Sequence, residues 1–342
     1  MLRGAVCAAM LQHMTGEKRF LVVGAGTMGN GYARMLAGGR VPGAVLAGVV
    51  DIDGTKALEL AGATGAPAFG DIETAIAATG ADAAYVATPD GLHRVPVETL
   101  AQRGLSILVE KPLATTVEDA HAMIEAVNDA GVYAEVNYSN RWNPPFIEAM
   151  RSVESGEVGE LRSFNVCLNN PVSSPRDRLR WSGGTTPAWF LMSHCLDLAL
   201  WLGRKKALTV YASGGRGELA GYGIETYDWI HAVVRYADGA DGVFESCWIL
   251  PDSWPGGAEF NFKAIGTKGA ITVDTTYQNI AVTAERHRYP GTIQWAPARL
   301  QAFVRGIEGQ GRTRVSFEDG LEVTKTLVAI HRSLESGGVE TV

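Results

Sequence analysis

The sequence lacks several features that would each narrow its function at once. It has only four cysteines in 342 residues, and Cys7, Cys167, Cys195 and Cys247 form no CxxC pair. We therefore predict no disulfide framework, no metal site and a reducing compartment, the cytoplasm. No apolar run is long enough to span a bilayer. Basic residues are not in excess, because the net charge is -7, so neither nucleic acid nor a membrane is an expected partner.

The composition that remains is that of a globular protein, with 46% hydrophobic and 20% charged residues. A chain of this length exceeds one ordinary core, so we expect two domains. Residues 1–18 are expected to form an N-terminal extension. Gln12 and His13 interrupt its apolar run, which argues against a signal peptide and leaves Met10 and Met14 as alternative start residues.

Residues 19–137 alternate short apolar runs with helix-like segments. The predicted strands are Phe20–Val23, Val45–Val50, Ala83–Ala87, Ser106–Val109 and Val132–Val136. The predicted helices are Tyr32–Ala37, Thr55–Ala61, Val95–Arg103 and Thr116–Ala130. Continuous apolar strands that alternate with helices indicate a parallel sheet covered on both faces. The pattern predicts an α/β chain that begins with a doubly wound Rossmann domain.

Residues 138–342 change to consecutive strands with helices at either end. The strand-like runs are Leu161–Leu168, Ile230–Tyr236, Gly242–Trp248, Glu259–Ile265 and Ala270–Val273. The helix-like segments are Phe146–Val153, Trp189–Leu202, Arg299–Ile307 and Asp319–Leu334, and a loop covers Asn169–Arg180. Helices segregated from strands predict an α+β domain built on an open, mostly antiparallel sheet, which we assign to substrate binding and oligomerisation.

A glycine motif follows the first predicted strand and opens the first helix. Gly24, Gly26 and Gly29 frame Thr27 and Met28 in the pattern G-x-G-x-x-G. The first glycine permits a tight turn, the second lets the backbone approach a pyrophosphate, and the third allows close helix–strand packing. The motif predicts a dinucleotide site that includes all five residues.

Asp51 ends the second predicted strand, where a carboxylate can accept hydrogen bonds from the adenosine ribose. Its charge would repel a 2′-phosphate, and Ile52 rather than a cation follows. The sequence therefore favours NAD over NADP.

Several further motifs together resemble the Gfo/Idh/MocA family of oxidoreductases. They are Ala87-Thr88-Pro89 with His93, Glu110-Lys111-Pro112, Arg141-Trp142-Asn143-Pro144, GEVGELR, IGTKGAITV and SFEDGLEVTKTLVAIHRSL. The resemblance covers nearly the whole chain after residue 18. It implies that Thr88, Pro89, His93, Glu110 and Lys111 line the cofactor, with Lys111 over the reacting centre and a peptide bond before Pro112 that is often cis. A cation at that place favours an alkoxide-like transition state.

The segment WSGGTTPAWFLMSHCLDLALWLG resembles the family's second-domain catalytic helix. His194 falls on the catalytic histidine, and Asp197 on a later aspartate with an expected structural role. The family's earlier aspartate, four residues before the histidine, is Phe190 here. A histidine with an ordinary pKa of about 6.5 suits proton transfer, so His194 is the predicted general base. The predicted substrate-binding residues lie in or next to these motifs, which would place them near the pocket. They are Lys111, Arg141, Trp142, Trp181 and His194.

The leading interpretation is an NAD-dependent dehydrogenase that oxidises a secondary hydroxyl of a sugar, cyclitol or sugar-derived glycoside. One alternative is a glycoside-cleaving enzyme that oxidises a hydroxyl transiently, eliminates a substituent and returns the hydride. A second alternative is an NAD- or ligand-binding protein that has lost catalysis, as the Phe190 replacement would allow. The expected partner is a small polyol, and the open sheet predicts a homodimer or homotetramer.

Overall fold

The structure is a computed structural model that describes residues 16–254, 257–274, 279–283, 287–288, 298–311 and 313–342. Most of the predicted N-terminal extension, residues 1–15, lies outside the described residues. The chain divides into two compact units. The first contains the described residues of 1–110, 121–137 and 296–317, and the second contains those of 111–120, 138–295 and 318–342.

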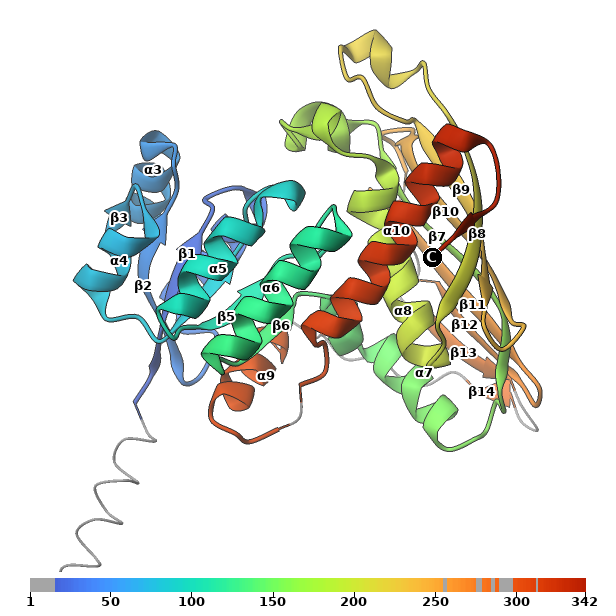
Figure 1. The fold of residues 1–342 in the computed structure, drawn as a ribbon, viewed down its shortest axis with the longest axis horizontal. Helices are drawn as coiled ribbons and strands as arrows, with labels where there is room; N and C mark the ends of the chain where they lie inside the picture. The colour runs from blue at the N-terminus through green and yellow to red at the C-terminus, as the bar shows by residue number, and fades with distance from the viewer. Residues whose placement is uncertain (1–15, 255–256, 275–278, 284–286, 289–297, 312) are drawn as a thin grey trace, which may run out of the picture. The chain divides into compact units, whose positions relative to one another are not determined.

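Six parallel strands form the sheet of the first unit, in the order β3-β2-β1-β4-β5-β6 (Figure 1). They are β1 (Lys18–Val23), β2 (Ala44–Val50), β3 (Ala68–Phe69), β4 (Ala83–Val86), β5 (Ser106–Val109) and β6 (Ala134–Val136). The helices between them are α2 (Thr27–Ala37), α3 (Gly54–Thr64), α4 (Ile72–Thr79), α5 (Arg94–Gln102) and α6 (Val117–Ala130). The strand order reverses between β1 and β4, which is the point where sheets of this kind bind ligands at their carboxyl ends.

A helix from late in the chain completes the core of the first unit. Helix α9 (Ala298–Ile307) contributes Leu300, Phe303 and Val304 to the same buried cluster as Phe20 and Val22 of β1. The sequence assigns this helix to the second domain, because nothing local distinguishes it from its neighbours. Its apolar face is instead buried in the first unit, so the two units are not continuous along the chain.

The second unit contains a nine-stranded sheet in the order β14-β13-β12-β11-β7-β10-β9-β8-β15. Its strands are β7 (Leu161–Pro171), β8 (Ala207–Gly215), β9 (Trp229–Tyr236), β10 (Asp241–Leu250), β11 (Glu259–Gly266), β12 (Ala270–Asp274), β13 (Asn279–Thr283), β14 (His287–Arg288) and β15 (Glu340–Thr341). Only the β7–β10 pair among these described strands is parallel. The predicted fold class, a Rossmann domain followed by an α+β domain on a mostly antiparallel sheet, is confirmed.

Alternating burial on these strands gives the sheet one covered and one open face. Along β9, Ile230, Ala232 and Val234 are buried, whereas the intervening His231 and Val233 are exposed. The covered face lies against α7 (Pro144–Glu154), α8 (Ser193–Gly203) and α10 (Phe317–Ser336) (Figure 1). This arrangement presents the predicted catalytic helix α8 on the inner side of the sheet.

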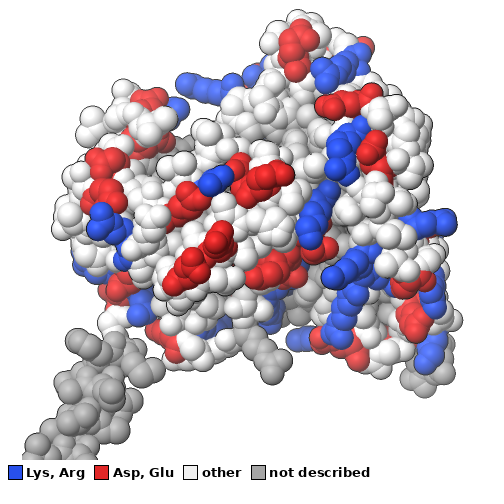
Figure 2. All heavy atoms as spheres, in the orientation of Figure 1, with Lys and Arg blue, Asp and Glu red and all other residues white. Residues whose placement is uncertain are grey.

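The face of the molecule that Figure 2 shows carries side chains of both charges. On the described residues that Figure 2 shows, acidic and basic side chains are interspersed. Among the described helices, none is both long enough and apolar enough to cross a membrane.

Candidate active site

The turn between β1 and α2 explains why each motif glycine occupies its position. Gly24 has φ of +100°, and a Cβ atom there would lie 2.5 Å from the carbonyl oxygen of Ala87. A Cβ atom on Gly29 would lie 1.8 Å from the carbonyl oxygen of Gly24, so only glycine lets α2 pack this closely. Gly26 differs, because a Cβ atom there would meet no other atom within 4 Å.

Gly26 is at the amino end of α2, where a Cβ atom would point into open space. No side chain caps this end of the helix. The first N–H groups of a helix have no partner within the helix and attract anions. Thr27 and Met28 are exposed in this same turn. The turn therefore fits the pyrophosphate of a dinucleotide, as the spacing of the glycines predicts.

Asp51 is fixed at the carboxyl end of β2 by two backbone hydrogen bonds. The N–H of Ala25 donates to its Oδ2 (2.7 Å), and the N–H of Asp53 donates to its Oδ1 (2.8 Å). Each carboxylate oxygen has a second lone pair that can accept from a ribose hydroxyl. The side chain of Ile52 is 96% exposed beside it. The carboxylate is thus held rigidly, with capacity left for a ligand.

The turn after β4 holds the next three predicted cofactor residues. Thr88 Oγ1 donates to the carbonyl oxygen of Leu92 (3.1 Å), and His93 Nε2 lies 3.1 Å from the carbonyl oxygen of Thr88. His93 is 1% exposed, whereas Pro89 is exposed. The histidine ring therefore closes this turn from inside, and a contact of its ring with the cofactor stays a prediction.

Glu110 lies in a buried polar cluster of the first unit. The Tyr85 hydroxyl and Asn137 Nδ2 both donate to Glu110 Oε1. Tyr32 stacks on Tyr85 with ring centroids 4.0 Å apart. Burial raises the pKa of Tyr85 well above its usual value, and the charge of Glu110 raises it further. The carboxylate of Glu110 thus anchors the end of β5, and its predicted contact with the cofactor remains untested.

Lys111 follows directly, and the peptide bond between Lys111 and Pro112 is cis. The lysine is only 8% exposed. Its Nζ donates to the carbonyl oxygen of Phe190 (2.7 Å) and lies 4.3 Å from the centroid of the Phe190 ring. The ammonium group is therefore directed to the turn that precedes α8.

His194, in the first turn of α8, lies close enough to Lys111 to respond to its charge. Burial lowers the pKa of His194 well below its usual value of 6.5, and the Lys111 ammonium lowers it further. The residue as a whole is only partly buried. A neutral imidazole beside a cation can accept a proton from a hydroxyl group whose oxygen the cation attracts. The second unit thus brings the two predicted catalytic residues together.

Asn140 is a contact of His194 that the sequence did not reveal. Its Nδ2 lies 3.4 Å from Nδ1 of the imidazole, and the Tyr138 ring meets His194 edge-on at 6.4 Å between centroids. An amide can face Nδ1 with either its nitrogen or its oxygen. The orientation of the Asn140 amide is therefore coupled to which ring nitrogen of His194 carries the proton. No motif marks it, although it directly precedes Arg141.

Arg141 has a different environment from the one that its predicted role in substrate binding requires. Its Nη2 donates to Asp197 Oδ1 (2.6 Å), its Nε lies 3.1 Å from both carboxylate oxygens, and its Nη1 donates to Asp319 Oδ2 (3.2 Å). The two carboxylates outweigh burial and raise the pKa of Arg141. Arg141 and Asp197 are both nearly inaccessible, so the guanidinium joins Ser139–Trp142 to α8 inside the second unit.

The two predicted tryptophans also differ in accessibility. Trp142 is 4% exposed and belongs to the core. Trp181 is partly exposed, and its ring meets that of Phe190 at 6.2 Å between centroids. Of the two, only Trp181 combines an accessible ring with a place next to the Lys111–Phe190 contact.

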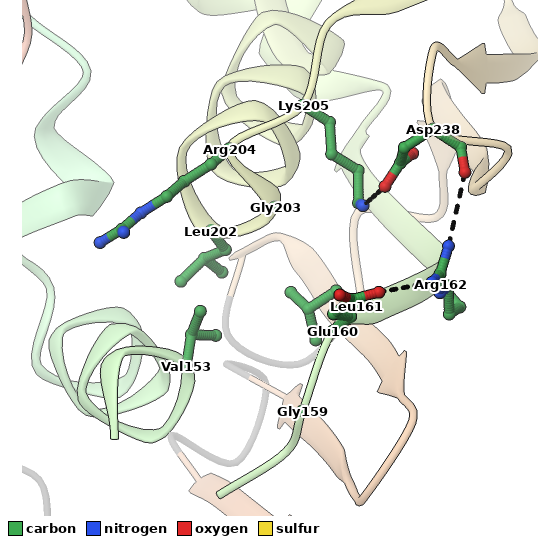
Figure 3. A pocket seen from close by; sticks show the side chains of 10 residues that line it. All are labelled: Val153, Gly159, Glu160, Leu161, Arg162, Leu202, Gly203, Arg204, Lys205 and Asp238. Carbon is green, nitrogen blue, oxygen red and sulfur yellow. Dashed lines mark hydrogen bonds and ion pairs between the residues drawn. The ribbon is translucent and has the colours of Figure 1, made fainter. Parts of the chain in front are cut away.

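The second unit also has an open cavity of about 490 Å³, lined by residues that Figure 3 shows. They are Val153, Gly159, Glu160, Leu161, Arg162, Leu202, Gly203, Arg204, Lys205 and Asp238. Each of its cations has a carboxylate partner: Arg162 pairs with Glu160, Arg204 with Glu154 and Lys205 with Asp238. None of the predicted site residues lines this cavity, so it does not replace the site around His194.

Sequence models of known families match both parts of the chain. The model of the oxidoreductase family with an NAD-binding Rossmann fold matches residues 18–138. The model of the GFO/IDH/MocA C-terminal domain matches residues 146–272. The chain belongs to the Gfo/Idh/MocA family.

Gfo/Idh/MocA relatives of known activity match at similar levels. Inositol 2-dehydrogenase of Rhizobium meliloti is 25% identical over 335 residues, which cover 92% of this chain and 96% of that protein. D-xylose 1-dehydrogenase (NADP(+)) 2 of Haloferax volcanii is 26% identical over 321 residues, covering 91% and 96%. The expected class, a nicotinamide-dependent dehydrogenase that acts on CH–OH groups, agrees with both the family and these relatives. The name of the Haloferax volcanii enzyme specifies NADP, whereas that of a scyllo-inositol 2-dehydrogenase of Bacillus subtilis, 27% identical over 278 residues, specifies NAD. The family therefore does not fix the cofactor.

Solved structures of other proteins share the fold. The WlbA dehydrogenase from Bordetella pertussis, in complex with NADH and UDP-GlcNAcA, is 26% identical with a TM-score of 0.79, covering 95% of this chain and 99% of that one. An aldose-aldose oxidoreductase from Caulobacter crescentus has a TM-score of 0.82 at 20% identity, covering 95% and 100%. At 20% identity, the similarity to the aldose-aldose oxidoreductase shows a shared fold only.

Proposed function

We propose that this chain is an NAD-dependent dehydrogenase that oxidises a secondary hydroxyl group of a sugar, cyclitol or sugar derivative. The observation that carries the proposal is the contact of the Lys111 ammonium with the carbonyl oxygen of Phe190, in the turn that leads directly into α8 and His194. Relatives named for inositol and xylose support the class of substrate. The non-catalytic alternative accounts less well for a chain that keeps both Lys111 and His194 and directs Lys111 at the turn before the histidine.

In this proposal NAD rather than NADP is the preferred cofactor. The carboxylate of Asp51 is fixed by two N–H groups and can accept a hydrogen bond from a ribose hydroxyl group, whereas it would repel a 2′-phosphate. Ile52 offers no charge to a phosphate. Gly24, Gly26 and Gly29 shape the pyrophosphate turn, and the turn Thr88–His93 together with Lys111 would border the nicotinamide end.

Oxidation of an alcohol to a ketone removes a hydride from carbon and a proton from oxygen. Bound NAD⁺ supplies the hydride acceptor, and the reaction then yields the ketone, NADH and one proton. Lys111 would attract the substrate oxygen, which favours the developing alkoxide. His194 would accept the hydroxyl proton, since its lowered pKa keeps the ring neutral. Trp181 supplies an aromatic surface for the apolar face of a sugar ring.

The test mixes the protein with NAD⁺ and a panel of myo-inositol, scyllo-inositol, D-xylose and D-glucose, and follows NADH by its absorbance. At least one polyol should reduce NAD⁺, and His194→Ala should lower kcat about 10²- to 10⁴-fold. The matched control is His231→Ala, which removes an exposed histidine of β9. Full turnover by His194→Ala would refute the assigned base.

The glycoside-cleaving alternative predicts a different balance of products. There, glycosides would be cleaved with no net NADH, and NAD would remain bound through purification. Mass spectrometry of the purified protein and product analysis with a methyl glycoside distinguish the two reactions. Net NADH in proportion to ketone supports the dehydrogenase.

The open face of the nine-stranded sheet supports a further part of the proposal, pairing with a second copy of the chain. Tyr211, Val233 and Val243 lie at matching register positions of β8, β9 and β10, and each is more than 40% exposed. Burial of this apolar row between two copies would stabilise a dimer. Light scattering at micromolar concentration tests it, and a monomer would contradict it.

A further inference from the structure

The chain immediately before the catalytic helix forms a π-helical turn, Ala188–Met192, which leads directly into α8. Wider turns of this kind are rare and often occur at functional sites, where they change the direction of backbone groups. Phe190 is at the centre of this turn. Its N–H donates to the carbonyl oxygen of Thr186 (3.0 Å), and its own carbonyl oxygen accepts from Lys111 Nζ (2.7 Å). The turn therefore directs a backbone carbonyl at the predicted catalytic cation.

The side chain of Phe190 contacts the same cation. Lys111 Nζ lies 4.3 Å from the ring centroid, within the range in which an ammonium is attracted to an aromatic face. Two indoles hold the ring: Trp181 at 6.2 Å and 73° between planes, and Trp248 at 5.8 Å and 58°. Trp248 is fully buried. The ring is thus packed against two other aromatic side chains.

We propose that Phe190 is a positioning residue that holds the Lys111 ammonium between its ring and its carbonyl oxygen, in reach of His194. The inference rests on the proposed function and deepens it. Ring and carbonyl are both neutral, so they orient the cation without cancelling its charge. An acidic side chain at this position would attract the ammonium more strongly but would also offset its field at the reacting oxygen and at His194.

The first experiment measures Lys111 itself and requires no turnover. Competitive acetylation with acetic anhydride is read by mass spectrometry over a pH series, with exposed Lys263 on β11 as the internal standard. It gives the half-labelling pH of Lys111, at which the labelling rate of this side chain reaches half of its maximum. Phe190→Leu keeps the carbonyl but removes the aromatic face, so the ammonium loses stabilisation. The half-labelling pH of Lys111 should fall by about 0.4 to 1.5 units. Phe190→Tyr should retain the wild-type value.

Phe190→Asp supplies the decisive contrast. A carboxylate favours the ammonium more than a ring does, so the half-labelling pH should rise in this variant while it falls in Phe190→Leu. Disordering of the turn would instead move both variants in the same direction. The control Phe164→Leu makes the same substitution in the sheet core, where Phe164 packs against Tyr236 and Phe262, and should leave Lys111 labelling unchanged.

The second experiment uses whichever polyol of the panel is oxidised. Phe190→Leu should lower kcat about 2- to 30-fold with a smaller change in KM, and Phe190→Tyr should restore it. An unchanged half-labelling pH in both Phe190→Leu and Phe190→Asp would overturn the proposal even if the enzyme is active. A protein that oxidises no polyol but shows the opposite labelling shifts would overturn the proposed function and leave this contact intact.

Discussion

Asp197→Asn removes the charge that holds Arg141 inside the second unit. The guanidinium donates to both carboxylate oxygens of Asp197 at 2.6 to 3.1 Å, and the two side chains are 3% and 1% exposed. Asparagine preserves the shape of the side chain but leaves a buried cation whose other carboxylate partner, Asp319, is 43% exposed. Breaking a buried ion pair from one side costs about 3–5 kcal/mol, because the remaining charge stays desolvated.

This loss of about 3–5 kcal/mol in the free energy of unfolding should lower Tm substantially. For a domain of roughly 150–250 residues, 1 kcal/mol corresponds to about 2–4 °C, so Asp197→Asn should lower Tm by about 6–20 °C. Circular dichroism and scanning calorimetry measure it, with separate transitions assigned if the two units unfold independently. The shift should belong to the transition of the second unit.

Asp319→Asn is the matched control for this prediction. It removes the other carboxylate partner of the same guanidinium, at 3.2 Å, from a side chain that is 43% exposed. Because Arg141 keeps Asp197 and solvent screens the Asp319 carboxylate, the loss should be about 0–1 kcal/mol, as for other screened pairs, which is about 4 °C in Tm at most. If Asp197→Asn destabilises the protein no more than Asp319→Asn, the buried pair does not join Ser139–Trp142 to α8 as described.

Three further predictions concern the cofactor and the histidine. Asp51→Ser should lower kcat/KM for NAD about 10- to 150-fold, the equivalent of one charge-assisted hydrogen bond, and an unchanged ratio of NAD to NADP use would argue against its assigned role. Asn140→Ala removes the partner of His194 Nδ1, so kcat should fall and the pH profile should change shape, whereas a change in KM alone would show that Asn140 only binds substrate. Because the pKa of His194 is lower in the folded protein, the unfolded chain binds a proton first as pH falls through about 6.5, and stability that is fully present above that pH is lost below it. Urea unfolding should therefore show that the wild type loses up to about 1.4 kcal/mol more per pH unit below 6.5 than His194→Gln, and equal losses would contradict the lowered pKa.

Elements with a strong local pattern were predictable from the sequence. The apolar runs of β1, β2, β4 and β5 lie within one or two residues of their predicted bounds, because buried parallel strands are continuously hydrophobic. The glycine motif was interpretable for the same reason, since Gly24 and Gly29 meet backbone atoms that tolerate no side chain.

Elements that depend on distant partners were not predictable. Strand β3 has two residues and α4 only eight, so neither has enough length to show a period. Strand β8 was missed, and α9 was assigned to the second domain although its apolar face completes the core of the first. The segment Trp189–Leu202 was predicted as one helix, whereas a π-helical turn precedes α8, because this turn depends on the contacts of Phe190.

The candidate site residues also divide into those that a local motif marks and those whose role depends on distant partners. The sequence singled out Lys111 and His194, and in the second unit Lys111 contacts Phe190 in the turn that precedes the helix of His194. It did not reveal that Asp197 and Asp319 occupy the Arg141 guanidinium, that Trp142 is buried, or that Asn140 contacts the imidazole. These depend on the packing of Ser139–Trp142 against α8, which joins segments more than 50 positions apart.

A crystal structure of the protein with NAD and a bound polyol tests the central claim most directly. The account predicts that Lys111 Nζ and a ring nitrogen of His194 both lie within about 2.6–3.2 Å of one hydroxyl oxygen of the polyol, with the carbon that bears it facing the nicotinamide ring. A polyol bound elsewhere, or a reacting hydroxyl group that neither side chain reaches, would contradict it.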